Sequence, residues 1–222
     1  MSTKLKIAAA VAAAVLLSAC SSPKHEPMPL VKFTPSMEVT EVWSKGLSSA
    51  EGFLVPAVYD DMVFAAGGKT LTRLNARTGE TEWSVSFNSP ITGGVGSDGY
   101  VTAVGLWDGN LEVVDAEGKV SWEKKLTTEL ASPPVVSHGL VIARTMDTRV
   151  SAFEASSGEL QWTYQRSQPA LTVRLPTRML AHDNFLLVGQ PNGHIVILDI
   201  ASGKPMFEFQ VAQAKGVTEV ER

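Results

Sequence analysis

The chain has 222 residues, 44% of them apolar, a formal net charge of −4 and one cysteine. A chain of this length and composition can bury a sizeable core, and a single cysteine excludes an intrachain disulfide. Charges of both signs are interspersed and no run rich in Lys or Arg occurs, which argues against a nucleic-acid partner.

The chain begins with a segment typical of a secretory signal peptide, which we assign to residues 1–19. Lys4 and Lys6 precede the apolar stretch 7–17, which is too short to span a bilayer. The letters LSAC, ending at Cys20, resemble the bacterial lipobox, in which the signal peptide is removed before a cysteine that is then acylated. We therefore expect Cys20 to be lipidated. The alternative is a plain signal peptide with an incidental cysteine.

Residues 20–37 are predicted to form a lipidated tether. One long acyl chain is worth on the order of 10 kcal/mol of membrane binding, and several make a stable anchor. Ser21 follows the cysteine, and by resemblance to the bacterial sorting rule this favours the outer membrane over the inner one. The tether is rich in proline, which favours an extended linker over a packed element. We expect the folded part to occupy residues 38–222.

The folded part repeats one short phrase in which a turn is followed by an aromatic residue. The phrase reads LNARTGETEW at 74–83, DAEGKVSW at 115–122, EASSGELQW at 154–162 and DIASGKPMF at 199–207. Its glycines are spaced by 39, 40 and 45 residues. Alternating apolar stretches flank each phrase and predict four antiparallel strands per repeat. Tandem units of this length are typical of an all-β fold, the β-propeller with four-stranded blades. The repeats are predicted at about 51–87, 88–126, 127–166 and 170–211.

Each part of the phrase has a physical role. Asn or Asp opens the turn by accepting backbone hydrogen bonds, and Gly supplies a positive φ. The aromatic residue begins the outer strand, where we expect it to pack against the neighbouring blade as a structural residue and not as a ligand-binding one. These blade-docking residues are Trp83, Trp122, Trp162 and Phe207.

The pattern N/D-A-x-T/S-G-x-x-x-W resembles the quinoprotein repeat, named after enzymes that use pyrroloquinoline quinone. The lipobox, the Pro-rich linker, VTEVWSKG at 39–46 and the tandem repeats together resemble the BamB family of outer-membrane assembly lipoproteins. This resemblance covers the whole chain. It implies a non-catalytic scaffold without a cofactor, anchored by its lipid to the outer membrane and facing the periplasm.

The resemblance also implies a partner, the barrel-forming assembly subunit BamA. The segment LTVRLPT at 171–177 is similar to the family's partner-contacting loop, so Leu171, Val173 and Arg174 are the expected contact residues. Val173 departs mildly from the family's L-x-L-R pattern. The last residues of the sequence, 212–222, match the segment that connects to the next blade in the family. Exposed strand edges are also expected to receive unfolded β-barrel clients by strand addition.

The number of repeats differs from that of the family. The resemblance implies eight blades, whereas this sequence holds four repeats, so we expect an incomplete ring and a truncated sequence. Residues 39–46 align with an outer strand, and Trp43 lies 40 residues before Trp83. Because the fourth repeat has its own outer strand, this strand is expected to be spare and its blade absent.

Two other functions remain open from the sequence: a fragment of a quinone-dependent dehydrogenase, and a periplasmic propeller that binds small ligands. The motif GVGSDG at 94–99 matches G-x-G-x-x-G, but no helix follows it, so we interpret it as a turn and not as a dinucleotide site. The histidines are scattered singly, without the spacing of metal ligands. No nucleophile motif or carboxylate-dense calcium loop is evident, so no catalytic, cofactor or metal residue is assigned.

Overall fold

The computed structural model describes residues 36–48, 54–166, 178–190 and 193–211. Contacts between Cα atoms divide the chain into two units, Met1–Thr40 and Glu41–Arg222, and every strand lies in the second. Cys20, most of the tether and the predicted contact residues Leu171, Val173 and Arg174 lie outside the described residues.

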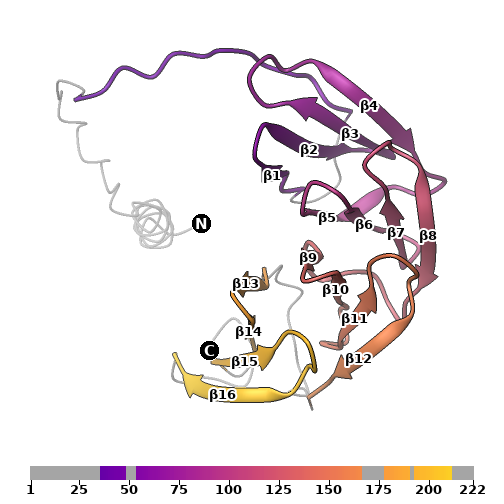
Figure 1. Ribbon diagram of the computed structural model, residues 1–222, viewed down its shortest axis with the longest axis vertical. Helices are drawn as coiled ribbons and strands as arrows, with labels where there is room; N and C mark the ends of the chain where they lie inside the picture. The colour runs from indigo at the N-terminus through magenta and orange to yellow at the C-terminus, as the bar shows by residue number, and fades with distance from the viewer. Residues whose placement is uncertain (1–35, 49–53, 167–177, 191–192, 212–222) are drawn as a thin grey trace, which may run out of the picture. The chain divides into compact units, whose positions relative to one another are not determined.

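The described residues form four antiparallel four-stranded sheets, in which the strand order follows the sequence (Figure 1). The first sheet holds β1 (Ala57–Tyr59), β2 (Met62–Gly67), β3 (Thr70–Asn75) and β4 (Thr81–Ser86). The second holds β5 (Ile91–Ser97), β6 (Thr102–Leu106), β7 (Asn110–Val114) and β8 (Val120–Lys125). The third holds β9 (Val135–Ser137), β10 (Leu140–Arg144), β11 (Val150–Glu154) and β12 (Leu160–Tyr164). The fourth holds β13 (Leu180–His182), β14 (Phe185–Gly189), β15 (His194–Asp199) and β16 (Pro205–Gln210). Among these residues there is no helix, and hence none that could cross a membrane.

Burial changes across each sheet in a regular way. The second strands β6 and β10 are buried along their whole length, whereas the fourth strands β8 and β16 are mostly or fully exposed. The apolar and β-branched residues of the middle strands suit a surface that is covered on both faces. A proline directly precedes β1, β5 and β9, where a missing N–H removes no hydrogen bond of the sheet.

Apolar cores form between consecutive sheets. One buried cluster joins the first and second sheets, a second joins the second and third, and a third joins the third and fourth. The first strands β1, β5, β9 and β13 contact one another in turn, and Figure 1 shows the fourth strands on the opposite side of the sheets. Sheets packed face to face around their first strands form a β-propeller. The all-β propeller prediction is therefore confirmed, and the described sheets form an incomplete ring.

Two segments differ from, or add to, the sequence-based expectations. Residues 39–46, expected to be an outer strand, have no regular secondary structure. A strand needs a hydrogen-bonding neighbour, and no described strand pairs with this segment.

The motif GVGSDG forms the end of β5 and the turn after it. A Cβ on Gly96 would lie 2.0 Å from the carbonyl oxygen of Pro134, so this glycine permits close approach of two backbones.

Candidate functional site

The repeated tryptophans bind to turns of the following sheet. The turn between the third and fourth strands of each sheet, which we call the Trp-binding turn, offers a backbone carbonyl to the indole N–H. Trp83 Nε1 donates to Ala116 O at 2.9 Å, and Trp122 Nε1 donates to Ala155 O at 2.8 Å. Trp162 Nε1 donates to Ile200 O at 2.8 Å. Each indole therefore packs its ring between two sheets, partly buried for Trp83 and Trp122 and buried for Trp162, and satisfies its single polar group there.

The glycine of each Trp-binding turn is required for two reasons. Gly79, Gly118, Gly158 and Gly203 all have φ between 67° and 83°, a backbone conformation that other residues adopt at a cost. A Cβ on any of them would also lie only 2.4 to 2.9 Å from the indole of the preceding tryptophan. The spacing of Gly and Trp in the repeated phrase thus encodes a contact between two different repeats.

Trp43 occupies the Trp-binding turn of the first sheet. Its Nε1 donates to Ala76 O at 2.8 Å, and a Cβ on Gly79 would lie 2.6 Å from its ring. No described strand pairs with the segment that holds Trp43, yet its side chain is docked, because the turn that receives it belongs to the first sheet.

Phe207 differs from the three tryptophans. It lies in β16, is 61% exposed, and has no N–H to donate to a turn. Met206, Phe209 and Val211 beside it are also exposed. Within the described part of the chain no sheet follows β16, so Phe207 does not pack between two sheets as the sequence analysis expected.

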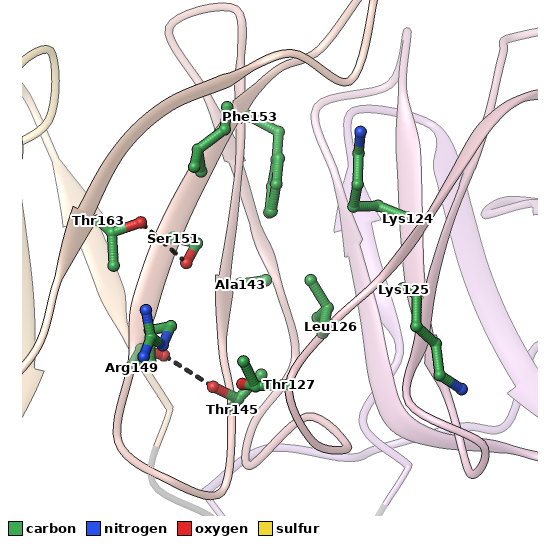
Figure 2. Close-up of a pocket in the computed structure, with 11 residues that line it drawn as sticks. Lys124, Lys125, Leu126, Thr127, Ala143, Thr145, Arg149, Ser151, Phe153 and Thr163 are labelled. Carbon is green, nitrogen blue, oxygen red and sulfur yellow. Dashed lines mark hydrogen bonds between the residues drawn. The ribbon is translucent and has the colours of Figure 1, made fainter.

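A groove of about 370 Å³ lies between β8 and the third sheet (Figure 2). We call it the Lys124 groove. Figure 2 shows Lys124 and Lys125 of β8 on one side, and Ser151, Phe153 and Thr163 of the third sheet on the other. Its remaining lining residues are Leu126, Thr127, Ala143, Thr145, Arg149 and Leu160.

The groove is open because of the residue that lies two positions after the tryptophan in each repeat. That residue is Val85 between the first and second sheets and Tyr164 between the third and fourth, and both pack against the local apolar core. Between the second and third sheets it is Lys124, and Lys45 holds the same position before the first sheet. Each lysine lines a groove. A lysine keeps its ammonium group in water and so leaves this space unfilled.

A pair of carboxyl groups lies on the second sheet. Glu112 of β7 is directly opposite Glu123 of β8 and is only 7% exposed. Burial, followed by the charge of Glu123, raises the pKa of Glu112 to about 7. The equivalent pairs in the first and third sheets are hydroxyl pairs, Thr72–Ser84 and Ser151–Thr163. This pair therefore distinguishes the second sheet from its neighbours.

The described residues bring no candidate metal site together. No group of three or more His, Cys, Asp or Glu side chains there has the geometry to hold a metal ion. The turn residues Asp115 and Asp199 accept backbone N–H groups of their own turns. Among the histidines, His194 lies 2.7 Å from a carboxylate oxygen of Glu208.

Sequence reasoning missed the Lys124 groove and the Glu112–Glu123 pair. The groove had a signal in the repeats. Aligned on the tryptophan, the second position after it reads Lys, Val, Lys and Tyr for Trp43, Trp83, Trp122 and Trp162. A lysine where other repeats carry an apolar residue predicts a gap between two sheets.

Comparisons with known proteins agree with this architecture. A family model described as outer membrane protein assembly factor BamB matches residues 67–222. A protein of that name from Burkholderia pseudomallei (strain K96243) is 38% identical over 220 residues, which cover 96% of this chain and 58% of that protein. Another from Bordetella pertussis is 32% identical, over 93% of this chain and 55% of that protein. The chain thus spans less than two thirds of the length of these relatives.

Solved structures show the same fold. The crystal structure of BamB from Moraxella catarrhalis superposes with a TM-score of 0.67 at 28% identity, over 76% of this chain and 52% of that one. A quinohemoprotein alcohol dehydrogenase from Pseudomonas putida has a TM-score of 0.56 at 17% identity, which shows a shared fold alone. Because the family model covers most of the described sheets and the relatives match nearly the whole sequence, the chain belongs to the family of outer membrane protein assembly factor BamB.

Proposed function

We propose that this protein is a non-catalytic scaffold that aids the assembly of outer-membrane β-barrel proteins. The observation that carries the proposal is similarity along nearly the whole chain to relatives named outer membrane protein assembly factor, together with a propeller fold. The propeller presents loops at the ends of rigid sheets, a suitable arrangement for protein contacts. The chain requires no reaction or cofactor for this role.

We further propose that the lipid on Cys20 holds the protein at the periplasmic side of the outer membrane. The support is the sequence LSAC and the Pro-rich segment that follows it. Cys20→Ser is expected to abolish membrane association while the sheets still fold. The measurement is fractionation of cells that lack the partner, with a high-salt wash. A variant that stays with the outer membrane would contradict the anchor.

The proposed partner is BamA, bound through Leu171, Val173 and Arg174. Support comes from the described strand that precedes this segment. β12 ends at Tyr164, which pairs with Val150 directly after the β10–β11 turn. The connection from β8 to β9 binds both this turn and the β6–β7 turn through backbone hydrogen bonds, so the two turns lie at the same end of their sheets.

That end of the sheets also exposes an aromatic residue. Trp107 in the β6–β7 turn is 61% exposed. Exposed tryptophan and arginine are the residues most often found as energetic centres of protein interfaces. Trp107 is therefore a further candidate for a partner contact at this end of the propeller.

The test is Arg174→Ala in the full chain, with Arg178→Ala as the matched control. We expect Arg174→Ala to weaken binding to the soluble domains of BamA by about 2 kcal/mol or more, because it removes a planar five-donor group from the contact. Arg178 is exposed just outside the segment, and its replacement should leave binding unchanged. Binding is measured by pull-down and titration, and stability by thermal melting. Equal effects of the two variants, or a fall in melting temperature that matches the lost binding, would remove this segment from the interface.

A further inference from the structure

The Lys124 groove has a charge that is unusual for this chain. Lys124, Lys125 and Arg149 line it, and no acidic residue does so among the described lining residues, although the chain as a whole carries −4. Lys125 Nζ donates to the carbonyl oxygen of Asp108, and Arg149 Nε lies 3.7 Å from a carboxylate oxygen of Asp147. Lys124 makes no ion pair within the described part of the chain. The groove therefore favours an anionic group near Lys124.

The wall opposite Lys124 is partly apolar. Phe153 and Ala143 are buried beneath the opening, whereas Leu160 is 53% exposed at its edge. The exposed surface of Leu160 gains stability when a second apolar group covers it, whereas Phe153 adds little further area because it is already buried. A ligand of this groove would therefore carry an apolar group beside its anionic group.

Hydroxyl groups make up much of the remaining lining. Thr145 and Thr127 donate to the carboxylate of Asp147. Ser151 and Thr163 form a cross-strand pair with an oxygen–oxygen distance of 3.4 Å, in which one hydroxyl donates to the other. One hydroxyl hydrogen of the Ser151–Thr163 pair is therefore left for a ligand, and an alkyl chain would cover it without accepting a hydrogen bond, which costs free energy. An extended peptide has a backbone N–H and C=O at every residue, so one of its carbonyl groups can accept this hydrogen. A volume of about 370 Å³ is at the small end of ligand sites and suits a few residues.

We propose that the Lys124 groove binds a short extended peptide segment that carries an acidic side chain next to a large apolar one. The carboxylate pairs with Lys124, the apolar side chain covers Leu160 at the edge of the floor that Phe153 forms, and the peptide backbone bonds to the Ser151–Thr163 hydroxyl pair of β11 and β12. This binding does not depend on the assembly role proposed above, and its test does not use BamA.

The chain contains a matched control groove. Lys45 has the same repeat position before the first sheet and lines a groove of about 210 Å³. That groove is lined by hydroxyls including Thr70, Thr72 and Ser84, and Leu47 is its one large apolar residue among the described lining residues. It has the cation and the hydroxyls but not the aromatic floor, so we expect it to bind the same peptide weakly or not at all.

The experiment is calorimetric titration of the full chain with the capped peptide acetyl-Phe-Glu-Leu-amide and with its Gln analogue. We expect Lys124→Val to lower affinity for the Glu peptide at least tenfold, because valine removes the charge and occupies the space, as Val85 does between the first two sheets. Lys124→Gln should lower it several-fold. The Gln peptide should bind wild type several-fold more weakly and be insensitive to Lys124→Gln. Lys45→Val should leave affinity unchanged.

Several outcomes would overturn the proposal. Unchanged affinity in Lys124→Val would show that the peptide binds elsewhere. An equal loss in Lys45→Val would show that any groove lysine suffices, without the apolar floor. Equal sensitivity of the Glu and Gln peptides to Lys124→Gln would remove the proposed ion pair. Binding of decanoate at this groove with no binding of either peptide would assign the site to an amphiphilic anion instead.

Discussion

Two interfaces between sheets can be compared, the first–second and the second–third. They share the contact made by the tryptophan and differ in the residue two positions after it. In both, an indole from the outer strand donates to a Trp-binding turn of the following sheet. Two residues later the first interface has Val85, which packs in the apolar core, and the second has Lys124, which lines a groove. The tryptophan thus fixes how two sheets meet, and the residue two positions on decides whether the space beside it is filled.

The residues on the receiving sheet differ as well. At equivalent positions the second sheet carries Glu112 and Glu123, and the third carries Ser151 and Thr163. The carboxyl pair lies in the sheet that comes after β4, the strand that holds Val85. The hydroxyl pair lies in the sheet that comes after β8, the strand that holds Lys124. At the interface between the first and second sheets, the buried carboxyl group of Glu112 therefore has Val85, and not a lysine, at the position equivalent to Lys124. The raised pKa of Glu112 agrees with this.

The largest expected effect is on the shared contact. Trp122→Ala should lower the free energy of unfolding by about 3–5 kcal/mol, because it empties the space between two sheets. Trp122→Phe retains most of the ring and loses the bond to Ala155 O, so its cost should be about 1–2 kcal/mol. Denaturant titration measures both. If the two variants lose equal stability, the hydrogen bond and not the buried ring dominates the contact.

The next effect separates close packing from backbone conformation. Gly158 and Gly139 have almost the same φ, 71° and 72°, but a Cβ on Gly158 would lie 2.8 Å from Trp122, whereas nothing lies within 4 Å of one on Gly139. Gly139→Ala should cost about 1–2 kcal/mol for the left-handed backbone alone. Gly158→Ala should cost a further 1–3 kcal/mol, approximately, for displacing the indole. Equal melting temperatures for the two variants would mean that the indole moves without cost.

A smaller, pH-dependent effect is expected at Glu112. Its folded pKa is about 7, above the ordinary value of 4.5. Between these two values the folded state holds a proton that the unfolded state has lost, so stability falls as pH rises, and the full penalty remains above pH 7. Glu112→Gln removes this penalty. The variant should gain on the order of 1 kcal/mol over wild type at pH 8 and little at pH 4, because solvent screens part of the effect.

A second substitution connects this effect to the comparison between interfaces. Val85→Lys places a cation where the other interface has Lys124, and it should lower the pKa of Glu112. The measurement is the pH dependence of unfolding in Val85→Lys with and without Glu112→Gln. A pH profile of Val85→Lys that matches wild type would show that the two positions do not interact.

The smallest expected effect is that of Lys124→Val on stability. Valine is the natural residue at this position in the first interface, so it should fill the groove without strain and change the unfolding free energy by about 0.5–1 kcal/mol, toward greater stability. Thermal melting beside Lys45→Val provides the comparison. A loss of several kcal/mol would mean that Lys124 holds the two sheets together.

Much of the fold could be predicted from the sequence, because its signals are local. Alternating apolar residues, a Gly-containing turn and a following aromatic residue recur in each repeat, and they predict four strands per repeat because strand and turn formation depend on neighbouring residues. The predicted repeats at 51–87, 88–126 and 127–166 each contain one complete sheet. The predictions for Cys20, Leu171, Val173 and Arg174 fall outside the described residues and stay predictions.

The sequence by itself determined the strand pattern and the place of the Gly–Trp turns. Only the tertiary structure decided which sheet receives each tryptophan, that Trp43 is docked whereas Phe207 is exposed, and that Lys124 borders an open groove. The physical reason is the range of the interactions. A turn or strand depends on a few adjacent residues, whereas the space beside an indole is filled by side chains from two sheets, more than thirty residues apart in the chain. Likewise, the pKa of Glu112 depends on burial between sheets, which no local pattern encodes.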